Sequence, residues 1–192
     1  MGQLKALLRW EERPLLVYQT EQMLASSVER VAVVLGHRAG ELALLLPADE
    51  RIVVVENPDY RSGKVSSILA GVRAAPADAA TLIVGVDQPR PAALVEGVVR
   101  AHRSRVGMAI TIAAYAGRRG HPLLISGGLR EEVLAIEEAS EGLRAVLQRH
   151  RDHVFLYETG SPLALLNLNT LEDYAAALRL TSSSSSALAG NQ

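Results

Sequence analysis

The stretch Thr81–Pro91 reads TLIVGVDQPRP, and it sets the pattern for the fold. Its first half is a near-continuous apolar run, which is typical of a strand buried on both faces of a parallel sheet. Its second half is an aspartate followed by a segment with two prolines. Two similar apolar runs come earlier in the chain, RVAVVLG at Arg30–Gly36 and RIVVVEN at Arg51–Asn57. The three runs together predict a parallel sheet.

Longer amphipathic segments lie between and after these runs and predict the helices. They are Pro14–Ser27, Arg38–Leu46, Ser66–Ala75, Pro91–Arg105, Gly128–Ile136, Ser140–Arg149 and Leu171–Leu180. Further strands are predicted at Met108–Tyr115 and His121–Ser126, around the turn AGRRG, and at HVFLYET (153–159) and ALLNLN (164–169). The alternation predicts an α/β domain over residues 1–180, with right-handed crossovers. Residues 181–192, TSSSSSALAGNQ, are expected to form a disordered tail.

Composition excludes several classes of function. The chain has 192 residues with a formal net charge of −1, which gives no reason to expect a nucleic-acid or membrane partner. It has no cysteine, which excludes disulfides and thiolate metal sites. No apolar run reaches the roughly 20 residues of a membrane span, and no secretory signal is visible. We therefore expect a cytoplasmic protein.

Polar residues at the strand ends mark the expected functional edge, because ligands of open α/β sheets bind beyond the carboxyl ends of the strands. Asp87 follows an apolar strand and could hold a divalent cation, since Mg²⁺ often uses one or two carboxylates together with substrate phosphates. The same carboxylate could instead cap the helix near Pro91 or a turn. The residues alone leave both interpretations open.

Three other segments are candidates for binding. In NPDYRSGKVSSILAG (Asn57–Gly71), backbone amides at a helix start could hold an anion, although the serines could simply cap that helix. In GRRGHPLLI, a basic group including His121 could meet an anionic substrate, or form a solvated hairpin tip. In LLNLNTLEDY, Asn167 and Asn169 are expected on one face of a strand, where they could bind a metal or a ribose, unless Asn169 or Thr170 caps the next helix.

The order of these motifs carries more weight than any one of them. GxxK, NPxYxxGxxSSxxAG, DQP, GxxGHP and NxNTxEDY together resemble the molybdenum cofactor nucleotidyltransferases, within the MobA-like NTP transferases. The resemblance runs from Met1 to about Leu180, and DQP and RRGHP look more like the cytidylyltransferase branch. It implies a three-layer Rossmann-like fold, like that of type-A glycosyltransferases, with a mostly parallel central sheet. It also implies Mg²⁺-dependent transfer of CMP from CTP to molybdopterin, with release of pyrophosphate.

The resemblance also implies roles for individual residues. Lys5 becomes a triphosphate contact and Asp87 the principal metal ligand, with Asn167 or Asn169 as a possible second ligand. The residues implied to line the nucleotide and acceptor sides are Gly2, Asn57, Gly63, Ser66, Ser67, Gly71, Gln88, Pro89, Gly120 and His121. A molybdoenzyme or its chaperone is a possible further partner.

The chain departs from the family pattern at its start. The family begins with a buried strand and a glycine-rich loop of the form LAAGxSxRMGxxK, whereas this chain begins at the MG of that pattern. We therefore expect the first strand and most of the loop to be missing from the printed sequence. Either Met1 is an internal methionine of a longer protein, which we favour, or the chain is truncated and weak or inactive.

Other functions stay open. A guanylyltransferase, or a nucleotidyltransferase acting on another small phosphorylated acceptor, would share most of these motifs. A non-catalytic homologue that binds a partner would fit the missing loop, while the presence of Lys5 and Asp87 favours a catalyst. A Rossmann oxidoreductase lacks support, because no GxGxxG follows any strand.

Overall fold

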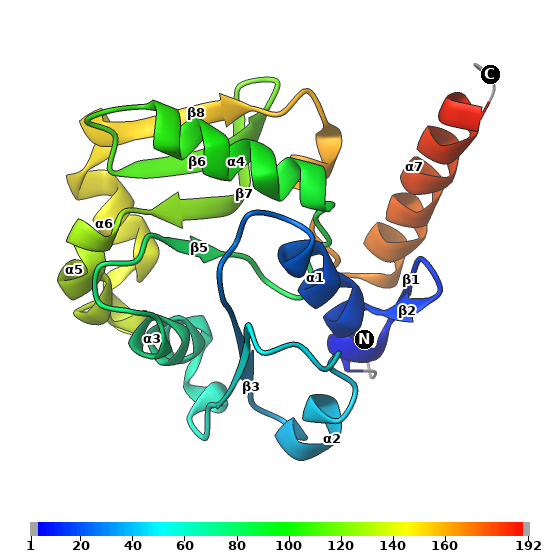
Figure 1. The fold of residues 1–192 in the computed structure, drawn as a ribbon, viewed down its shortest axis with the longest axis horizontal. Helices are drawn as coiled ribbons and strands as arrows, with labels where there is room; N and C mark the ends of the chain where they lie inside the picture. Colours follow the sequence, from blue (N-terminus) through cyan, green and yellow to red (C-terminus); the bar gives the residue numbers. More distant parts are fainter. Residues whose placement is uncertain (1–3, 190–192) are drawn as a thin grey trace.

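The structure is a computed structural model that describes residues 4–189, with side chains described for residues 4–180. Its strands form two sheets and a small hairpin (Figure 1). In the first sheet, β3 (Val31–Leu35) and β4 (Ile52–Glu56) pair in parallel. The second sheet has the order β5-β7-β6-β8, with β5 at Thr81–Ile83, β6 at Ile110–Tyr115, β7 at Arg118–Ile125 and β8 at Val154–Glu158. Within it only β7 runs against its neighbours.

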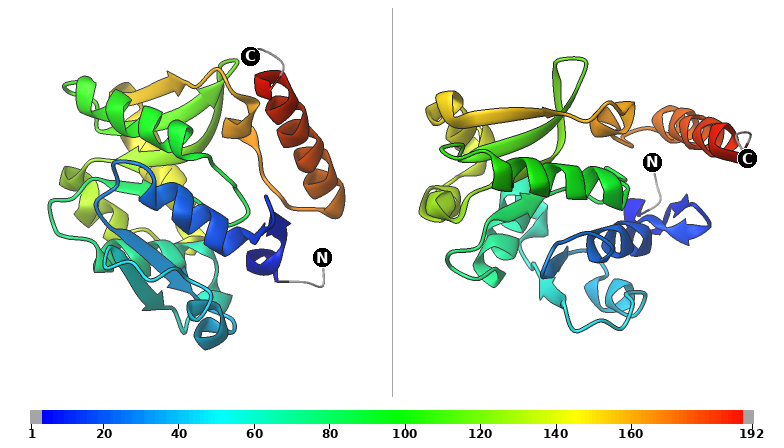
Figure 2. Two further views of the ribbon diagram at one scale, coloured as in Figure 1. Left: turned by 45° about the vertical axis from the view of Figure 1, so that its right-hand side comes forward. Right: turned by 45° about the horizontal axis from the view of Figure 1, so that its top comes forward.

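The helices lie on both sides of the sheets (Figures 1 and 2). They are α1 (Leu15–Leu24), α2 (Ala39–Ala43), α3 (Lys64–Ala74), α4 (Ala92–Ser104), α5 (Arg130–Leu134), α6 (Leu143–Arg149) and α7 (Leu171–Ala189). Short 3₁₀ turns connect them, including η1 (Lys5–Leu7) and η6 (Pro162–Leu165). Of the described helices, none is both long enough and apolar enough to cross a membrane.

The alternation of side chains along β6 and β7 makes the fold three-layered. Ile112 and Leu123 pack with residues of α3, α5 and α6 on one face. Ala113 and Leu124 pack with residues of α4 on the other face. Because successive side chains of a strand point to opposite faces, two helix layers can cover one sheet. The predicted α/β class and layered architecture are confirmed.

The hairpin at the start of the chain was not predicted. Its strands are β1 (Arg9–Trp10) and β2 (Arg13–Pro14), joined through Glu11 and Glu12 in the left-handed region, with φ of 47° and 65°. Positive φ at both central residues suits the right-handed twist of a hairpin, but it is uncommon for glutamate. For that reason the sequence gives only a weak indication of a hairpin here. Trp10, 1% exposed, packs edge-on against Tyr18 of α1.

Two local predictions are corrected. The segment ALLNLN (164–169) is not a strand: it begins in η6 and continues without regular structure. The turn between β6 and β7 is at Ala116 and Gly117, both with positive φ, so Arg118 and Arg119 lie on β7 and not in the turn. Helix α7 ends at Ala189, and the expected disorder of residues 181–192 stays a prediction.

A buried arginine holds together the segments behind the expected functional edge. Arg90 is 0% exposed, and its guanidinium donates only to backbone carbonyls. The acceptors are the carbonyl oxygens of Pro89 at 3.0 Å, His121 at 2.8 Å, Ala164 at 3.1 Å and Leu166 at 2.8 Å. These bonds tie the loop after β5 to β7 and to the segment around η6. They also occupy the carbonyls that a strand at 164–169 would have used in a ladder.

Arg90 is therefore expected to be a major source of stability. Replacing it in Arg90→Met leaves several buried carbonyls without a donor, which should lower the free energy of unfolding by about 3–5 kcal/mol. Urea denaturation measures this change. The exposed Arg118 on β7 provides the control, because Arg118→Met should change the free energy by no more than about 0.5 kcal/mol. Equal stability of the two variants would contradict a stabilising role for the hydrogen bonds of Arg90.

Candidate active site

Three residues far apart in the sequence meet at one ammonium group. Lys5 Nζ lies 2.8 Å from Asp87 Oδ2 and donates to Asn169 Oδ1 at 3.1 Å. The side chains of Lys5 and Asp87 are 32% and 16% exposed, so the pair is accessible but partly shielded from water. An ion pair in such a position interacts more strongly than one on the open surface. Lys5, Asp87 and Asn169, to which the resemblance gives roles in the site, thus meet in the structure.

The loop after β5 fixes the position of Asp87. The backbone N–H of Gly85 donates to Gln88 Oε1 at 2.9 Å, and the N–H of Leu168 donates to the carbonyl of Asp87 at 2.8 Å. A Cβ at Gly85 would lie 2.6 Å from Asp87 Oδ1, so a larger residue there would displace the carboxylate. Because its backbone is anchored, Asp87 directs its carboxylate at Lys5. Its expected alternative role, capping the following helix, is not what the hydrogen bonds show.

The two asparagines have different environments. Asn169 contacts Lys5, whereas Asn167 Oδ1 is buried without a hydrogen-bond partner. The start of α7 is capped by Thr170 and Asp173, since Asp173 N donates to Thr170 Oγ1 at 3.0 Å and Thr170 N donates to Asp173 Oδ2 at 2.9 Å. The capping interpretation is therefore right for Thr170. The side chain of Asn169 remains directed at the charged centre.

Asn57 organises the connection between β4 and α3. Its side-chain amide donates to Ser66 Oγ at 2.9 Å and to Ser67 Oγ at 3.0 Å, and its Oδ1 accepts from Asp59 N at 3.0 Å. Ser66 Oγ donates in turn to the carbonyl of Gly63 at 2.9 Å. These bonds satisfy the asparagine within the protein. The network shapes the connection, and it leaves Ser67 facing the cavity described next.

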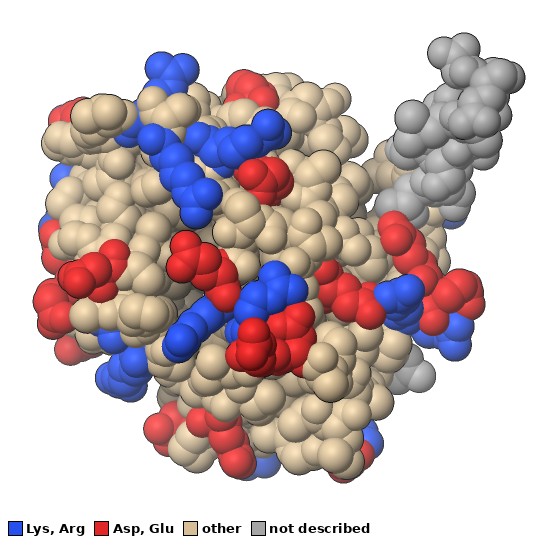
Figure 3. Space-filling model, in the orientation of Figure 1, with Lys and Arg blue, Asp and Glu red and all other residues tan. Residues whose placement is uncertain are grey.

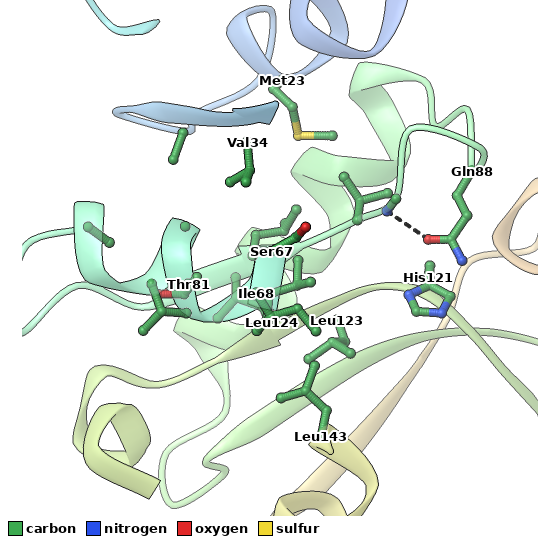
Figure 4. Close-up of a pocket in the computed structure, with 18 of the residues that line it drawn as sticks. Met23, Val34, Ser67, Ile68, Thr81, Gln88, His121, Leu123, Leu124 and Leu143 are labelled. Carbon is green, nitrogen blue, oxygen red and sulfur yellow. Dashed lines mark hydrogen bonds between the residues drawn. The ribbon is translucent and has the colours of Figure 1, made fainter. Parts of the chain in front are cut away.

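A cavity of about 1950 Å³ extends from the charged centre into the interior. Figure 4 shows Met23 and Val34 on one wall, Ser67, Ile68 and Leu124 on the other, and Gln88 and His121 at one end. The predicted residues that line it are Ser67, Gly71, Asp87, Gln88, Gly120 and His121. Asn57 and Ser66 line a separate cavity of about 640 Å³, Pro89 is buried, and Gly2 lies outside the described residues.

Two features require glycine at position 63: the backbone conformation there and the side chain of Glu138 beside it. Its φ of 121° suits glycine, and a Cβ there would lie 2.4 Å from the carboxyl carbon of Glu138. Glu138 Oε2 accepts from the N–H of Val65 at 2.9 Å, so this carboxylate occupies the N-terminus of α3. The sequence left open whether an anion binds at this helix start or the serines cap it. In the structure that anion is a side chain of the same chain.

His121 is held neutral. Burial, the guanidinium of Arg90 and the ammonium of Lys64 lower the pKa of His121 from 6.5 to about 4, while Asp87 acts in the opposite direction. Its Nδ1 is buried without a hydrogen-bond partner. A neutral imidazole beside positive side chains can donate or accept a hydrogen bond to a ligand without adding charge.

The oxygen donors at this centre suit a hard divalent cation. One carboxylate and one amide oxygen already converge on a positive charge, and the oxygen of Asn167, two residues before Asn169 in the chain, lacks a partner. Mg²⁺ takes such oxygen ligands and usually completes its shell with water and substrate phosphates. Among residues 4–180 no group of three His, Cys, Asp or Glu side chains could hold a metal by themselves. Asp87 with Asn169 is therefore the donor set that the structure brings together.

Sequence reasoning missed Arg90, Lys64 and Glu138. Arginine is usually exposed, so nothing in the sequence marked Arg90 as fully buried. Glu138 is far from Lys64 in the sequence, and the fold brings its carboxylate to the start of α3. Surface charge marks no further functional residues on the face that Figure 3 shows, because acidic and basic side chains are mixed there.

The low pKa of His121 predicts a pH dependence of stability. Between about pH 4 and 6.5 the unfolded state binds a proton at His121 that the folded state does not, so stability falls as the pH falls through this range. Urea denaturation of wild type and His121→Gln from pH 7 to 4.5 should show a relative change on the order of 1–3 kcal/mol. The exposed His153 provides the control, and His153→Gln should keep the wild-type slope. An equal slope for His121→Gln would contradict a buried neutral imidazole.

Comparison with known proteins identifies the family. A profile described as MobA-like NTP transferase domain matches residues 1–154. A nicotine blue oxidoreductase of Paenarthrobacter nicotinovorans is 34% identical over 153 residues, covering 76% of this chain and 73% of the relative. The molybdenum cofactor cytidylyltransferase of Escherichia coli K12 is 27% identical over 177 residues, covering 92% of this chain and 88% of the relative.

The fold has relatives among solved structures. A protein of Mycobacterium tuberculosis H37Rv, crystallised in complex with manganese, superposes with a TM-score of 0.73 at 20% identity, over 93% of each chain. At this identity the likeness concerns the fold, and it agrees with the layered α/β architecture. The matched profile covers most of the chain and confirms the resemblance drawn from the motifs. The chain belongs to the MobA-like NTP transferase family and is a nucleotidyltransferase.

Proposed function

We propose that this nucleotidyltransferase transfers CMP from CTP to the terminal phosphate of molybdopterin, with Mg²⁺ bound at Asp87. The observation that carries the proposal is the meeting of Lys5, Asp87 and Asn169 at the carboxyl edge of β5. The cytidylyltransferase of Escherichia coli supports CTP and molybdopterin as substrates. The manganese complex of the Mycobacterium tuberculosis protein supports a divalent cation.

The reaction joins two anions, and its main requirement is neutralisation of charge. An oxygen of the acceptor phosphate attacks the α-phosphorus of CTP, a new P–O bond forms, and the bond to pyrophosphate breaks. An ionised acceptor phosphate needs no general base. Catalysis then depends on positioning and on positive charge around the phosphates. The metal, when bound, supplies part of that charge.

The chain's own residues supply the rest. Lys5 is paired with Asp87 in this structure, and in the proposed complex its ammonium turns to the triphosphate while the Asp87 carboxylate holds the metal. Asn169 and Asn167 offer amide oxygens beside the same metal. His121, at the end of the cavity, faces the acceptor in the proposed complex. Because its imidazole is neutral, it neither attracts nor repels the acceptor through charge.

GTP as donor and another small phosphorylated acceptor are variants of this proposal. A second candidate function is a redox reaction, favoured by the 34% identity to a nicotine blue oxidoreductase. Membership of the family establishes nucleotidyl transfer, while the site decides which substrates are used and whether a redox reaction is supported as well. A non-catalytic binding role is a third outcome that the experiment below distinguishes.

The experiment measures three activities of the purified chain side by side. Pyrophosphate release is followed with Mg²⁺, molybdopterin and either CTP or GTP, and oxidation of a reduced nicotinamide cofactor is followed with nicotine blue as the electron acceptor and without nucleotide triphosphate. Calorimetry measures CTP binding in the presence of Mg²⁺. Pyrophosphate release with CTP supports the proposal, and release with GTP alone selects the guanylyl variant. Cofactor oxidation without pyrophosphate release selects the redox function, and binding without turnover selects the non-catalytic role.

Asp87→Asn tests the proposed role of the carboxylate. The substitution keeps the shape but removes the charge that holds the metal, so turnover should fall by about 10²–10³-fold with the fold retained. The control is Glu172→Gln, an exposed charge change at the start of α7 that should leave turnover unchanged. The double variant Lys5→Met/Asp87→Asn removes both members of the ion pair, so it should be as stable as the single variants without recovering turnover. Full turnover in Asp87→Asn would contradict the mechanism.

A further inference from the structure

Lysine is rare in this chain, and its two occurrences are at the functional edge. Of the 20 lysine and arginine residues only two are lysines, Lys5 and Lys64. Lys5 contacts Asp87 at the charged centre. Lys64 is the first residue of α3, the helix that follows β4. Because a helix that follows a strand of an open α/β sheet begins near the carboxyl end of that strand, both ammonium groups belong to the expected functional edge.

Lys64 lies on the face of α3 that borders the large cavity. The residues of this face are Lys64, Ser67, Ile68 and Gly71, and all four line the cavity. Their spacing of three and four residues is that of neighbours on one side of a helix. Figure 4 shows Ser67 and Ile68 of this face among the lining side chains. Lys64 is therefore the charged residue at the N-terminal end of this wall.

Lys64 is within electrostatic reach of His121, which lies at one end of the cavity. After burial and the guanidinium of Arg90, the ammonium of Lys64 is the next cause of the lowered pKa of His121. The Nδ1 atom of His121 is buried without a hydrogen-bond partner. A positive charge and an unsatisfied ring nitrogen are thus found at the same end of the cavity.

The ammonium of Lys64 is exposed and is not neutralised by the protein. Among the residues whose side chains the structure describes, no carboxylate forms an ion pair with it. The carboxylate of Glu138, at the start of the same helix, accepts from the backbone N–H of Val65 instead. That N–H is therefore occupied, while the ammonium is available to an anion from solution. An ammonium group binds phosphate well as a compact point charge.

We propose that Lys64 binds the phosphate monoester of the acceptor substrate, next to His121. The inference rests on the proposed transfer to a phosphorylated acceptor, and it names the residue that selects that phosphate. The reaction brings two anions together, and Lys5 with the metal neutralises the nucleotide side. The acceptor phosphate needs a cation of its own, which Lys64 supplies from α3. The unsatisfied nitrogen of His121 is then available to hydrogen-bond a polar group of the same acceptor.

Steady-state kinetics separate acceptor binding from nucleotide binding. Lys64→Met should raise the KM for molybdopterin by about 10–100-fold, because a charge-assisted contact is lost, and should leave the KM for CTP within about twofold. Lys64→Arg keeps the positive charge and should recover most of the loss. The matched control is Arg73→Met, which removes an exposed charge of the same helix outside this cavity and should change neither KM. An unchanged KM for molybdopterin in Lys64→Met, or an equal rise in both KM values, would overturn the proposal.

Acetylation of the two lysines tests the inference without turnover. The purified chain is treated with a limiting amount of acetic anhydride, and mass spectrometry measures acetylation of Lys5 and Lys64 separately. The ligands are molybdopterin, inorganic phosphate, and CTP with Mg²⁺, each compared with sodium chloride of equal ionic strength. Molybdopterin or phosphate at ten times its dissociation constant should slow acetylation of Lys64 by about 10-fold. CTP with Mg²⁺ should protect Lys5 and leave Lys64 reactive.

The outcomes distinguish this inference from the proposed reaction. If no nucleotide releases pyrophosphate but inorganic phosphate protects Lys64, the proposed reaction fails and the phosphate site is supported. Protection of Lys64 by CTP and not by molybdopterin or phosphate places this lysine on the nucleotide side and overturns the proposal. Acetylation of Lys64 at the sodium chloride rate with all three ligands overturns it as well.

Discussion

The arrangement of the site depends on one buried guanidinium. Arg90 carries its charge into the interior, where burial lowers its pKa from 12.5 to about 10, and no carboxylate contacts it there. Its donors are instead satisfied by backbone carbonyls from segments that are distant in sequence. Backbone carbonyls cannot move independently of their chain, so the arginine fixes His121 and the segment before Asn167 relative to Asp87. A buried charge bonded in this way costs desolvation free energy but strongly defines the geometry.

The more exposed part of the site holds an ion pair. In the proposed complex, each member of this pair would bind a substrate component in place of the other member. Lys5 and Asp87 neutralise each other here, and each is the natural partner of one substrate component, an anionic phosphate or a metal cation. Glu138 plays a comparable role at the start of α3, where its carboxylate occupies a position suited to an anion. The free protein thus satisfies its own charges where ligands are proposed to bind.

The comparisons illustrate how far a fold constrains function. Relatives of this chain carry the names of a cytidylyltransferase and of an oxidoreductase, although one family profile describes most of the chain. A layered α/β scaffold brings strand ends, helix starts and loops to one edge, and this edge can serve many reactions. The assignment as a nucleotidyltransferase comes from the family match, and the proposed chemistry is argued from Lys5, Asp87 and Asn169 and not from the sheet.

Local composition predicted most of the strands and helices in their order, because apolar runs and amphipathic periods depend on it. The sequence also marked Lys5, Asp87 and Asn169, through motifs that resemble a family. It was wrong about the strand at 164–169 and gave no sign of the buried state of Arg90, because both depend on hydrogen bonds between distant segments. The residues that meet at the charged centre and the side chains that face the cavity became visible only in the folded chain. These features arise from long-range packing, which no local pattern encodes.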